Sequence, residues 1–398
     1  MKNYKVSDGE CIIQETKKII GKIDNEDCDK ITRVVIPNSV VIIDKDAFAY
    51  CSKLTDVVIP NSVVEIGDFA FGGCEELSNI IMSNSVVDIN NYAFYNCQCL
   101  NESVIPESVV RIGRSAFEDC PNLKNIILPK TVEIIENNPF KHCDLTSIIV
   151  DKGNNFYDSR ENCNAIIETE TNKLIVGCKN STIPTSVVEI CNNAFFYCTD
   201  LKNIVIPNSV VEIGDFAFYN CIGLTEINMP DAVVTIGFAA FSFCIQLSEV
   251  YIPKSVTQVG SRAFSNCNLV KISVSEDNEV YDSRNNCNAI IETNSNTLIA
   301  GCLNTIIPEN IKIIGKGAFE GCPIVNIVIP KSVKEMQADS FYRCINLKHV
   351  TLLNIDTKFP KNAFKYCNTI ESINVPKGSA EFYKKQLSKR LQNFVKEF

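Results

Sequence analysis

The sequence contains no tryptophan and only two histidines among 398 residues. Because His142 and His349 lie far apart in the chain, most routes to histidine-based acid–base catalysis and histidine-rich metal sites are removed. No run of about 18 apolar residues occurs, so the sequence predicts no membrane span. The first residues, MKNYKVSDGECIIQ, lack the apolar segment and cleavage site of a signal peptide. Taken at face value, the sequence predicts a soluble intracellular protein.

Clustered basic residues are also missing, and the net charge is −9 with a pI near 5.1. A nucleic-acid-binding surface needs grouped lysine and arginine side chains to displace counterions, so we expect no nucleic-acid partner. The segment Gly315-Lys316-Gly317 lacks the spacing of a phosphate-binding loop. The sequence therefore predicts neither a cofactor nor a catalytic centre.

The chain is built from repeats with a 23-residue period, marked by an Ile-Pro step and a cysteine. The prolines are Pro37, Pro60, Pro106, Pro129, Pro184, Pro207, Pro230, Pro253, Pro308 and Pro330. The cysteines are Cys51, Cys74, Cys97, Cys120, Cys143, Cys198, Cys221, Cys244, Cys267, Cys322, Cys344 and Cys367. We call this set the ladder cysteines.

The consensus of one repeat is L-x-x-I-x-I-P-x-S-V-x-x-I-G-x-x-A-F-x-x-C-x-x-L. Apolar residues alternate with outward-facing ones before the proline, which predicts a short strand that the proline ends. Ser-Val-x-x-Ile predicts a second extended piece, followed by a turn at the glycine. Ala-Phe-x-x-Cys predicts a single helical or 3₁₀ turn that places Phe71 and Cys74 inward. One unit cannot bury its apolar side, but a stack of units can.

These repeats resemble the BspA-like leucine-rich repeat family, in its Treponema-type class with 23-residue repeats. The resemblance covers residues 31–376 and implies a right-handed curved solenoid of the α/β type. It further implies a parallel β-sheet on the concave side and short 3₁₀ or irregular turns on the other side. For function, the resemblance implies adhesion or host-protein binding, often by surface-exposed microbial proteins.

The chain ends and two inserts interrupt the repeat. Residues 1–30 predict an N-terminal capping hairpin, with 10–21 as its strands, and residues 377–398 predict a C-terminal capping helix. The alternative for this helix is a docking surface for an acidic partner. Hairpins are expected within 151–180 and 275–304, because 148–184 is repeated at 272–308.

The ladder cysteines are expected to form a buried wall rather than disulfides or a zinc site. Side chains at neighbouring ladder positions run parallel about 4.8 Å apart, and their Cβ vectors do not converge. Cysteines outside the ladder are Cys11, Cys28, Cys99, Cys163, Cys178, Cys191, Cys287 and Cys302. The pairs Cys163/Cys178 and Cys287/Cys302 leave a disulfide or a reactive thiol site open as an alternative.

The first insert also carries an oxygen-rich set that could hold calcium: Asp151, Asn154, Asn155, Asp158 and Glu161. The second insert replaces Asp151 with Ser275 and Asn155 with Glu279, so a structural loop is the preferred interpretation. The segment 157–160 is identical to 281–284 and predicts a turn with a local contact between aspartate and arginine.

The outward residues of the strands form a polar column beside a mostly β-branched one. They are Asp56, Val58, Asn79, Ile81, Glu102, Val104, Asn125, Ile127, Asn203, Val205, Glu226, Asn228, Glu249 and Tyr251. Strand propensity alone could explain the β-branched column. The other interpretation is a binding face, because an apolar stripe with a polar border marks an interaction surface.

The leading functional hypothesis is a monomeric, non-enzymatic module that binds a protein through this concave face, as in adhesion or host-protein binding. An intracellular scaffold of the same fold is the second hypothesis. The third, from another class, is a metal- or thiol-dependent protein that uses the insert cysteines.

Overall fold

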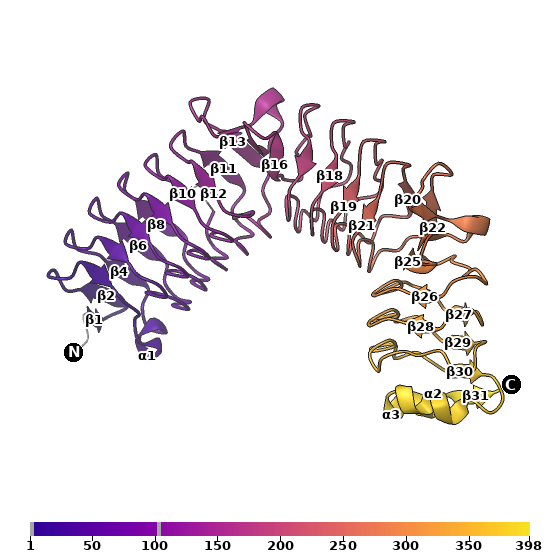
Figure 1. Cartoon of the computed structure of the whole chain (residues 1–398). Helices are drawn as coiled ribbons and strands as arrows, with labels where there is room; N and C mark the ends of the chain where they lie inside the picture. Colours follow the sequence, from indigo (N-terminus) through magenta and orange to yellow (C-terminus); the bar gives the residue numbers. More distant parts are fainter. Residues whose placement is uncertain (1–3, 102–104) are drawn as a thin grey trace. The chain divides into compact units, whose positions relative to one another are not determined.

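The computed structural model describes residues 4–101 and 105–398. The chain divides into two units, Met1–Cys198 and Thr199–Phe398, and each is described here by itself. In both units successive repeats stack as turns of a solenoid with parallel strands (Figure 1). The predicted repeat solenoid with parallel sheets is therefore confirmed.

Two columns of strands run along the first unit. The longer strands are β1 (Tyr4–Ser7), β2 (Glu10–Ile13), β4 (Arg33–Val35), β6 (Asp56–Ile59), β8 (Asn79–Met82), β11 (Asn125–Leu128) and β13 (Ser147–Val150). The shorter strands are β3 (Ile19–Ile20), β5 (Ile42–Ile43), β7 (Glu65–Ile66), β9 (Asp88–Ile89), β10 (Arg111–Ile112), β12 (Ile134–Ile135) and β17 (Glu189–Ile190). Pairing between repeats is parallel in both columns.

The second unit follows the same plan. Its longer strands are β20 (Glu249–Ile252), β22 (Lys271–Val274), β27 (Asn326–Ile329), β29 (His349–Leu352) and β30 (Ser372–Val375). Its shorter strands are β18 (Glu212–Ile213), β19 (Thr235–Ile236), β21 (Gln258–Val259), β26 (Ile313–Ile314) and β28 (Glu335–Met336). No strand is assigned at 203–206 or 226–229, although both segments keep the predicted alternation of buried and exposed residues.

Proline and glycine fix the path between the two strands of a repeat. The backbone N–H three residues after each of the ten repeat prolines donates to the proline carbonyl, as from Val63 to Pro60 at 3.1 Å. A Cβ at Gly67 would lie 2.7 Å from the backbone nitrogen of Lys45. The glycine is thus required by close packing against the preceding repeat, rather than by the turn alone.

Stacked phenylalanines and cysteines form the core beneath the Ala-Phe-x-x-Cys turns. The rings of Phe48, Phe71 and Phe94 are fully buried, with centroids 5.3 and 5.4 Å apart. The Sγ of Cys97 donates to the carbonyl of Phe71 at 3.3 Å, and the same bond recurs along the ladder. All ladder cysteines are buried except Cys198, which is half-buried. The predicted wall is confirmed.

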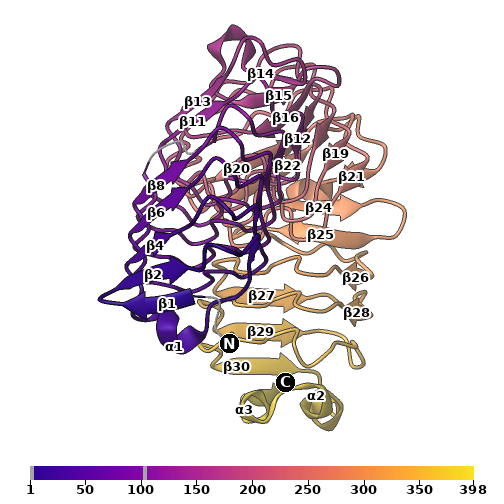
Figure 2. The same ribbon diagram turned by 90° about the vertical axis from the view of Figure 1, so that its left-hand side faces the viewer.

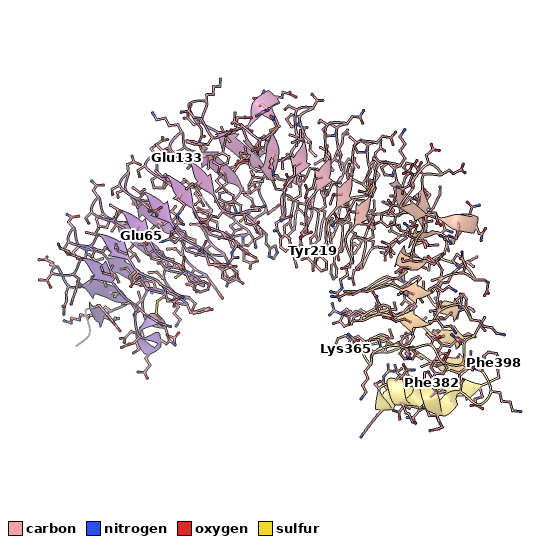
Figure 3. All side chains as sticks on the ribbon, viewed as in Figure 1. Glu65, Glu133, Tyr219, Lys365, Phe382 and Phe398 are labelled. Carbon is pink, nitrogen blue, oxygen red and sulfur yellow. A yellow bond between two sulfur atoms is a disulfide. The ribbon has the colours of Figure 1, made fainter. Side chains whose placement is uncertain are left out.

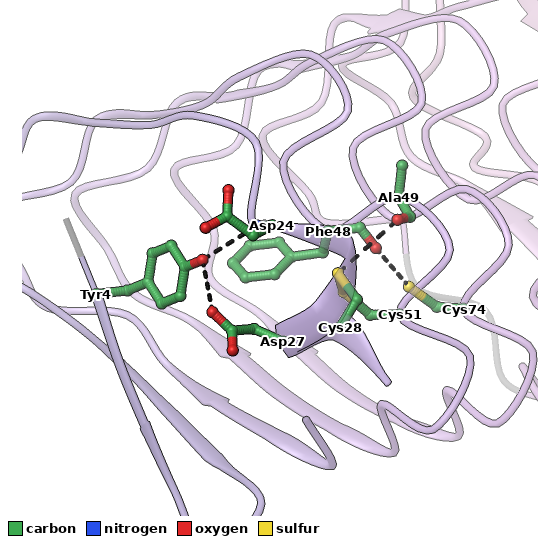
Figure 4. The surroundings of a disulfide bond; sticks show 8 residues. All are labelled: Tyr4, Asp24, Asp27, Cys28, Phe48, Ala49, Cys51 and Cys74. Atoms are coloured by element: carbon green, nitrogen blue, oxygen red, sulfur yellow. Dashed lines mark hydrogen bonds between the residues drawn. A yellow bond between two sulfur atoms is a disulfide. The ribbon is translucent and has the colours of Figure 1, made fainter. Parts of the chain in front are cut away.

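One ladder pair contradicts the prediction that neighbouring cysteines do not bridge. Cys28 and Cys51 form a disulfide with their Cα atoms 4.3 Å apart (Figure 4). Cys28 lies one repeat before Cys51 and therefore belongs to the ladder, contrary to its assignment from the sequence. It comes from helix α1 (Asn25–Cys28), not from the usual turn, so its side chain starts from a different backbone geometry.

Both inserts contain the predicted hairpin. The first comprises β14 (Tyr157–Asp158), η1 (Arg160–Asn162), β15 (Ile166–Glu168) and β16 (Lys173–Val176). The second comprises β23 (Tyr281–Asp282), η2 (Arg284–Asn286), β24 (Ala289–Glu292) and β25 (Thr297–Gly301). In each, the third and fourth elements pair antiparallel. The last strand of each insert then pairs in parallel with the following repeat.

The predictions for the chain ends need two corrections. Residues 10–21 form no hairpin, because β2 pairs with β1 and β4, whereas β3 pairs with β5. The hairpin is instead β1–β2, and residues 10–21 are already part of the first solenoid turn. The C-terminal helix is split into α2 (Ala380–Gln386) and α3 (Lys389–Gln392), followed by strand β31 (Val395–Glu397). Figure 2 shows both helices below β30 at the end of the second unit.

Candidate protein-binding surface

We call the outward side chains of the longer strands the strand face. In the first unit its apolar column is continuous over four repeats: Ile12, Val35, Val58 and Ile81 are register partners on β2, β4, β6 and β8. Ile127 and Ile149 are partners on β11 and β13. Their exposed fractions are 46, 40, 46, 65, 52 and 53% in chain order. The column is thus open to solvent along its described length.

A polar column lies beside the apolar one. Asp56 accepts hydrogen bonds from the hydroxyl of Thr55 at 2.5 Å and from the amide nitrogen of Asn79 at 3.0 Å. The hydrogen bond from Thr55, and to a smaller extent the one from Asn79, lowers the pKa of Asp56 below its ordinary value. Asn125 and Ser147 continue the column on β11 and β13. The carboxylate of Asp56 therefore presents a negative charge at neutral pH.

The strand face of the second unit is more polar. Glu226, Glu249 and Tyr251 line a shallow hollow of about 500 Å³, together with Lys271 and Ser273. The ammonium of Lys271 lies 3.5 Å from a carboxylate oxygen of Glu249. Asn203, Val205 and Asn228 are exposed on the segments that lack assigned strands.

The prediction of these residues from the sequence was incomplete. Glu102 and Val104 lie outside the described residues. Ile12, Val35 and Ile149 belong to the same column but were missed, although the alternation in 33–36 and 147–150 is that of the other repeats. That the strand face lies on the concave side, and that it binds a partner, stay predictions.

A second hollow, of about 800 Å³, lies between β13 and the first insert loop. Four of the five oxygen-rich residues line it, Asp151, Asn154, Asp158 and Glu161, whereas Asn155 does not. Protein groups already bind three of these side chains, those of Asp151, Asn154 and Asp158. Arg160 donates to Asp158 from Nε at 2.7 Å and from Nη2 at 2.5 Å, and Asn154 Nδ2 donates to the carbonyl of Pro129 at 2.8 Å. The same contacts recur at Arg284, which confirms the predicted local pair of aspartate and arginine.

Burial of Asp158 acts to raise its pKa, but the bonds from Arg160 and Thr169 outweigh burial and lower the pKa below its ordinary value. Among the described residues no cluster of three metal-ligating side chains occurs.

The insert cysteines are separate thiols in the structure. Cys163 and Cys178 are both buried and free, as are Cys287 and Cys302. Burial raises the pKa of each of these thiols. A buried thiol with a raised pKa holds little thiolate at neutral pH, and thiolate is the reactive form. The geometry does not favour the thiol-dependent alternative.

Comparison with protein families identifies the repeats. The family model described as "BspA type Leucine rich repeat region (6 copies)" matches residues 16–162, 166–290 and 295–392. The chain belongs to the BspA-type leucine-rich repeat family. The resemblance inferred from the sequence is thereby confirmed. Among curated proteins, no match was found.

Solved structures support the fold of this BspA-type chain. It is similar to a leucine-rich repeat protein from Eubacterium ventriosum, with 21% identity, a TM-score of 0.59, and coverage of 94% of this chain and 88% of that one. It is also similar to the pneumococcal vaccine antigen PcpA, with 17% identity, a TM-score of 0.53, and coverage of 100% and 88%.

The family and fold indicate a protein-interaction module, of a kind that is typically non-enzymatic. None of the described helices is long and apolar enough to cross a membrane.

Proposed function

We propose that this chain is a non-enzymatic module that binds a protein through the strand face, in adhesion to a host or partner protein. The observation that carries the proposal is the apolar column Ile12, Val35, Val58 and Ile81, with Ile127 and Ile149 on later repeats. Solvent-exposed apolar residues in one line, bordered by polar groups, suit a partner that buries them.

Charged side chains lie on the same surface. Beside the apolar column, Asp56 offers a carboxylate, and in the second unit Glu226 and Glu249 line the polar hollow. With a net charge of −9, the chain favours a basic partner at long range. The partner would bury β-branched side chains at its centre and place lysine or arginine at its border.

Site-specific photo-crosslinking tests this proposal. A photoreactive amino acid at Ile81 should form a covalent adduct with the partner, because this side chain, 65% exposed, is the most exposed of the column residues named above. The same amino acid at Val64, which is 40% exposed but lies outside the strand face, is the matched control. Adducts of equal yield at both positions would contradict the proposal.

The source of the partner separates adhesion from intracellular scaffolding. Crosslinking is carried out in parallel with extracellular-matrix proteins of a host and with an extract of the cells that make this protein. An Ile81-specific adduct in the first sample alone supports adhesion. An adduct in the second sample alone supports the scaffold and contradicts adhesion.

A further inference from the structure

Three aromatic side chains lie next to one another on the turns of the first unit, away from the strand face. The ring centroids of Tyr50 and Phe69 are 5.4 Å apart, and those of Phe69 and Tyr92 are 6.4 Å apart. They line a hollow of about 440 Å³ together with Asp68, Asn91 and Arg114. Each of the three aromatic residues lies close in sequence to a buried phenylalanine. The phenylalanine packs in the core of its repeat, and the neighbouring aromatic side chain lies on the opposite side of the turn.

Two consecutive glycines form the floor beneath two of these rings. A Cβ built on Gly72 would lie 2.5 Å from the Phe69 ring, and one on Gly73 would lie 2.7 Å from Cδ1 of Tyr50. The rings therefore lie against bare main chain, and Tyr50 remains 66% exposed. No other repeat has glycine at both positions: Tyr95-Asn96 takes them in the next repeat, and Glu320-Gly321 has only the second glycine. The repeat with Gly72-Gly73 thus builds an aromatic platform that the others cannot form in this way.

Polar groups at the edge of the platform are oriented by the backbone. The N–H of Asn91 donates to Oδ1 of Asp68 at 3.0 Å, and the N–H of Arg114 donates to Oδ1 of Asn91 at 2.9 Å. The guanidinium of Arg114 lies over the Tyr92 ring, 5.7 Å from its centroid. Oδ2 of Asp68 and the side-chain nitrogen Nδ2 of Asn91 have no hydrogen-bond partner among the described residues. Hydrogen-bond acceptors and donors thus lie beside the exposed surface of the aromatic rings.

We propose that this hollow binds a carbohydrate, with the C–H face of a hexose stacked on Tyr50 and Phe69. A sugar ring combines an apolar face with hydroxyl groups that both donate and accept hydrogen bonds. The hydroxyls can donate to Asp68 and accept from Asn91 or Arg114. A proline-rich peptide, the other common ligand of aromatic grooves, offers chiefly carbonyl acceptors and leaves Oδ2 of Asp68 without a donor.

Three variants test the platform. Tyr50→Ala and Phe69→Ala each remove a stacking surface, whereas Gly73→Asn inserts a side chain where the Tyr50 ring lies. Asparagine fits the backbone there, because Gly73 has φ of 77° and Asn96 occupies the same repeat position with φ of 55°. Binding is measured on a glycan array that covers hexose, N-acetylhexosamine and sialylated chains, and decaproline is included as the peptide probe. We expect each variant to lose at least about tenfold in affinity for the glycan that the wild type binds.

Tyr366→Ala is the matched control, because Tyr366 takes the repeat position of Tyr50 and is 48% exposed but does not line the hollow. It should bind the glycan as the wild type does. Absence of any glycan binding by the wild type, equal binding by Tyr50→Ala, or binding of decaproline alone would each overturn the proposal. A failure here leaves protein binding by the strand face untouched, since the two sites share no residue.

Discussion

At the scale of single residues, the ladder cysteine acts as a hydrogen-bond donor to the backbone. The Sγ of Cys74 lies 3.2 Å from the carbonyl oxygen of Phe48 in the preceding repeat. Burial raises the pKa of Cys74 and Cys97, because a thiolate there would lose its hydration. The thiol therefore stays protonated and keeps its donor. A serine would be more polar and an alanine would lack the donor, which explains why cysteine suits this position.

The raised thiol pKa values predict a loss of stability in alkaline solution. Their contribution is complete below the unfolded-state thiol pKa of about 8.5 and is lost as pH rises from there toward the folded-state pKa. Each titrating thiol lowers the free energy of unfolding by up to about 1.4 kcal/mol per pH unit. The variant Cys74→Ala, Cys97→Ala, Cys120→Ala should thus lose less stability than the wild type between about pH 8 and 10. Urea unfolding under reducing conditions measures this difference, and parallel losses would contradict the account.

Exposure predicts which thiol reacts first. Cys99 is exposed and lies outside the ladder, whereas Cys97, two residues earlier, is fully buried. A water-soluble thiol reagent should label Cys99 in the native protein at least about 100-fold faster than any ladder cysteine, since thiolate fraction and access both decrease with burial. Mass spectrometry of the labelled protein locates the modified residue, and Cys99→Ser is the control. Rapid labelling of Cys97 in the native state would contradict a buried wall.

At the scale of elements, each insert is attached to the solenoid by a tyrosine. The backbone N–H of Ile135 on β12 donates to the Tyr157 hydroxyl at 2.9 Å, and Val259 on β21 does the same to Tyr281 at 3.0 Å. The two inserts therefore dock on the preceding repeat in the same way. This contact accounts for the tyrosine shared by the two copies of Tyr-Asp-Ser-Arg, and the bonds from arginine to aspartate account for those two residues.

Removal of this hydroxyl should destabilise the protein measurably. Tyr157→Phe leaves the N–H of Ile135 without its partner, and we expect a loss of about 1–2 kcal/mol in the free energy of unfolding. Tyr366→Phe, which alters an exposed tyrosine, should change the free energy by less than about 0.5 kcal/mol. Thermal or urea unfolding compares the two variants. Equal effects would show that the insert is not held by this bond.

The local sequence pattern predicted the strands of the repeats well, because the same alternation of buried and exposed residues recurs from repeat to repeat. The N-terminal segment was mispredicted for a physical reason. Its two apolar runs, at Cys11 and at Ile19–Ile20, have hairpin-like spacing, yet both find parallel partners in the next repeat. The Cys28–Cys51 bridge was missed because α1 replaces the usual turn. Both differences occur where the first repeat departs from the consensus.

At the scale of the whole molecule, the sequence predicts which residues point outward but not what they contact. All described members of the predicted set are exposed or half-buried, since alternation in a strand decides this directly. The platform of Tyr50 and Phe69 was not predicted, because the Tyr50 ring lies against Gly73 of the next repeat. A contact between repeats cannot be inferred from the pattern within one repeat.

The central claim, that the strand face binds a protein, is tested most directly by a triple substitution. Val58→Lys, Ile81→Lys and Ile127→Lys together place charge in the apolar column, at side chains exposed enough to leave the fold intact. The matched control replaces Val64, Ile134 and Val188, which are exposed outside the strand face, by lysine. The measurement is the Kd for the crosslinked partner, with circular dichroism to verify folding. We predict a rise on the order of 100-fold for the strand-face variant and little change for the control. An unchanged Kd in a folded strand-face variant would contradict the claim.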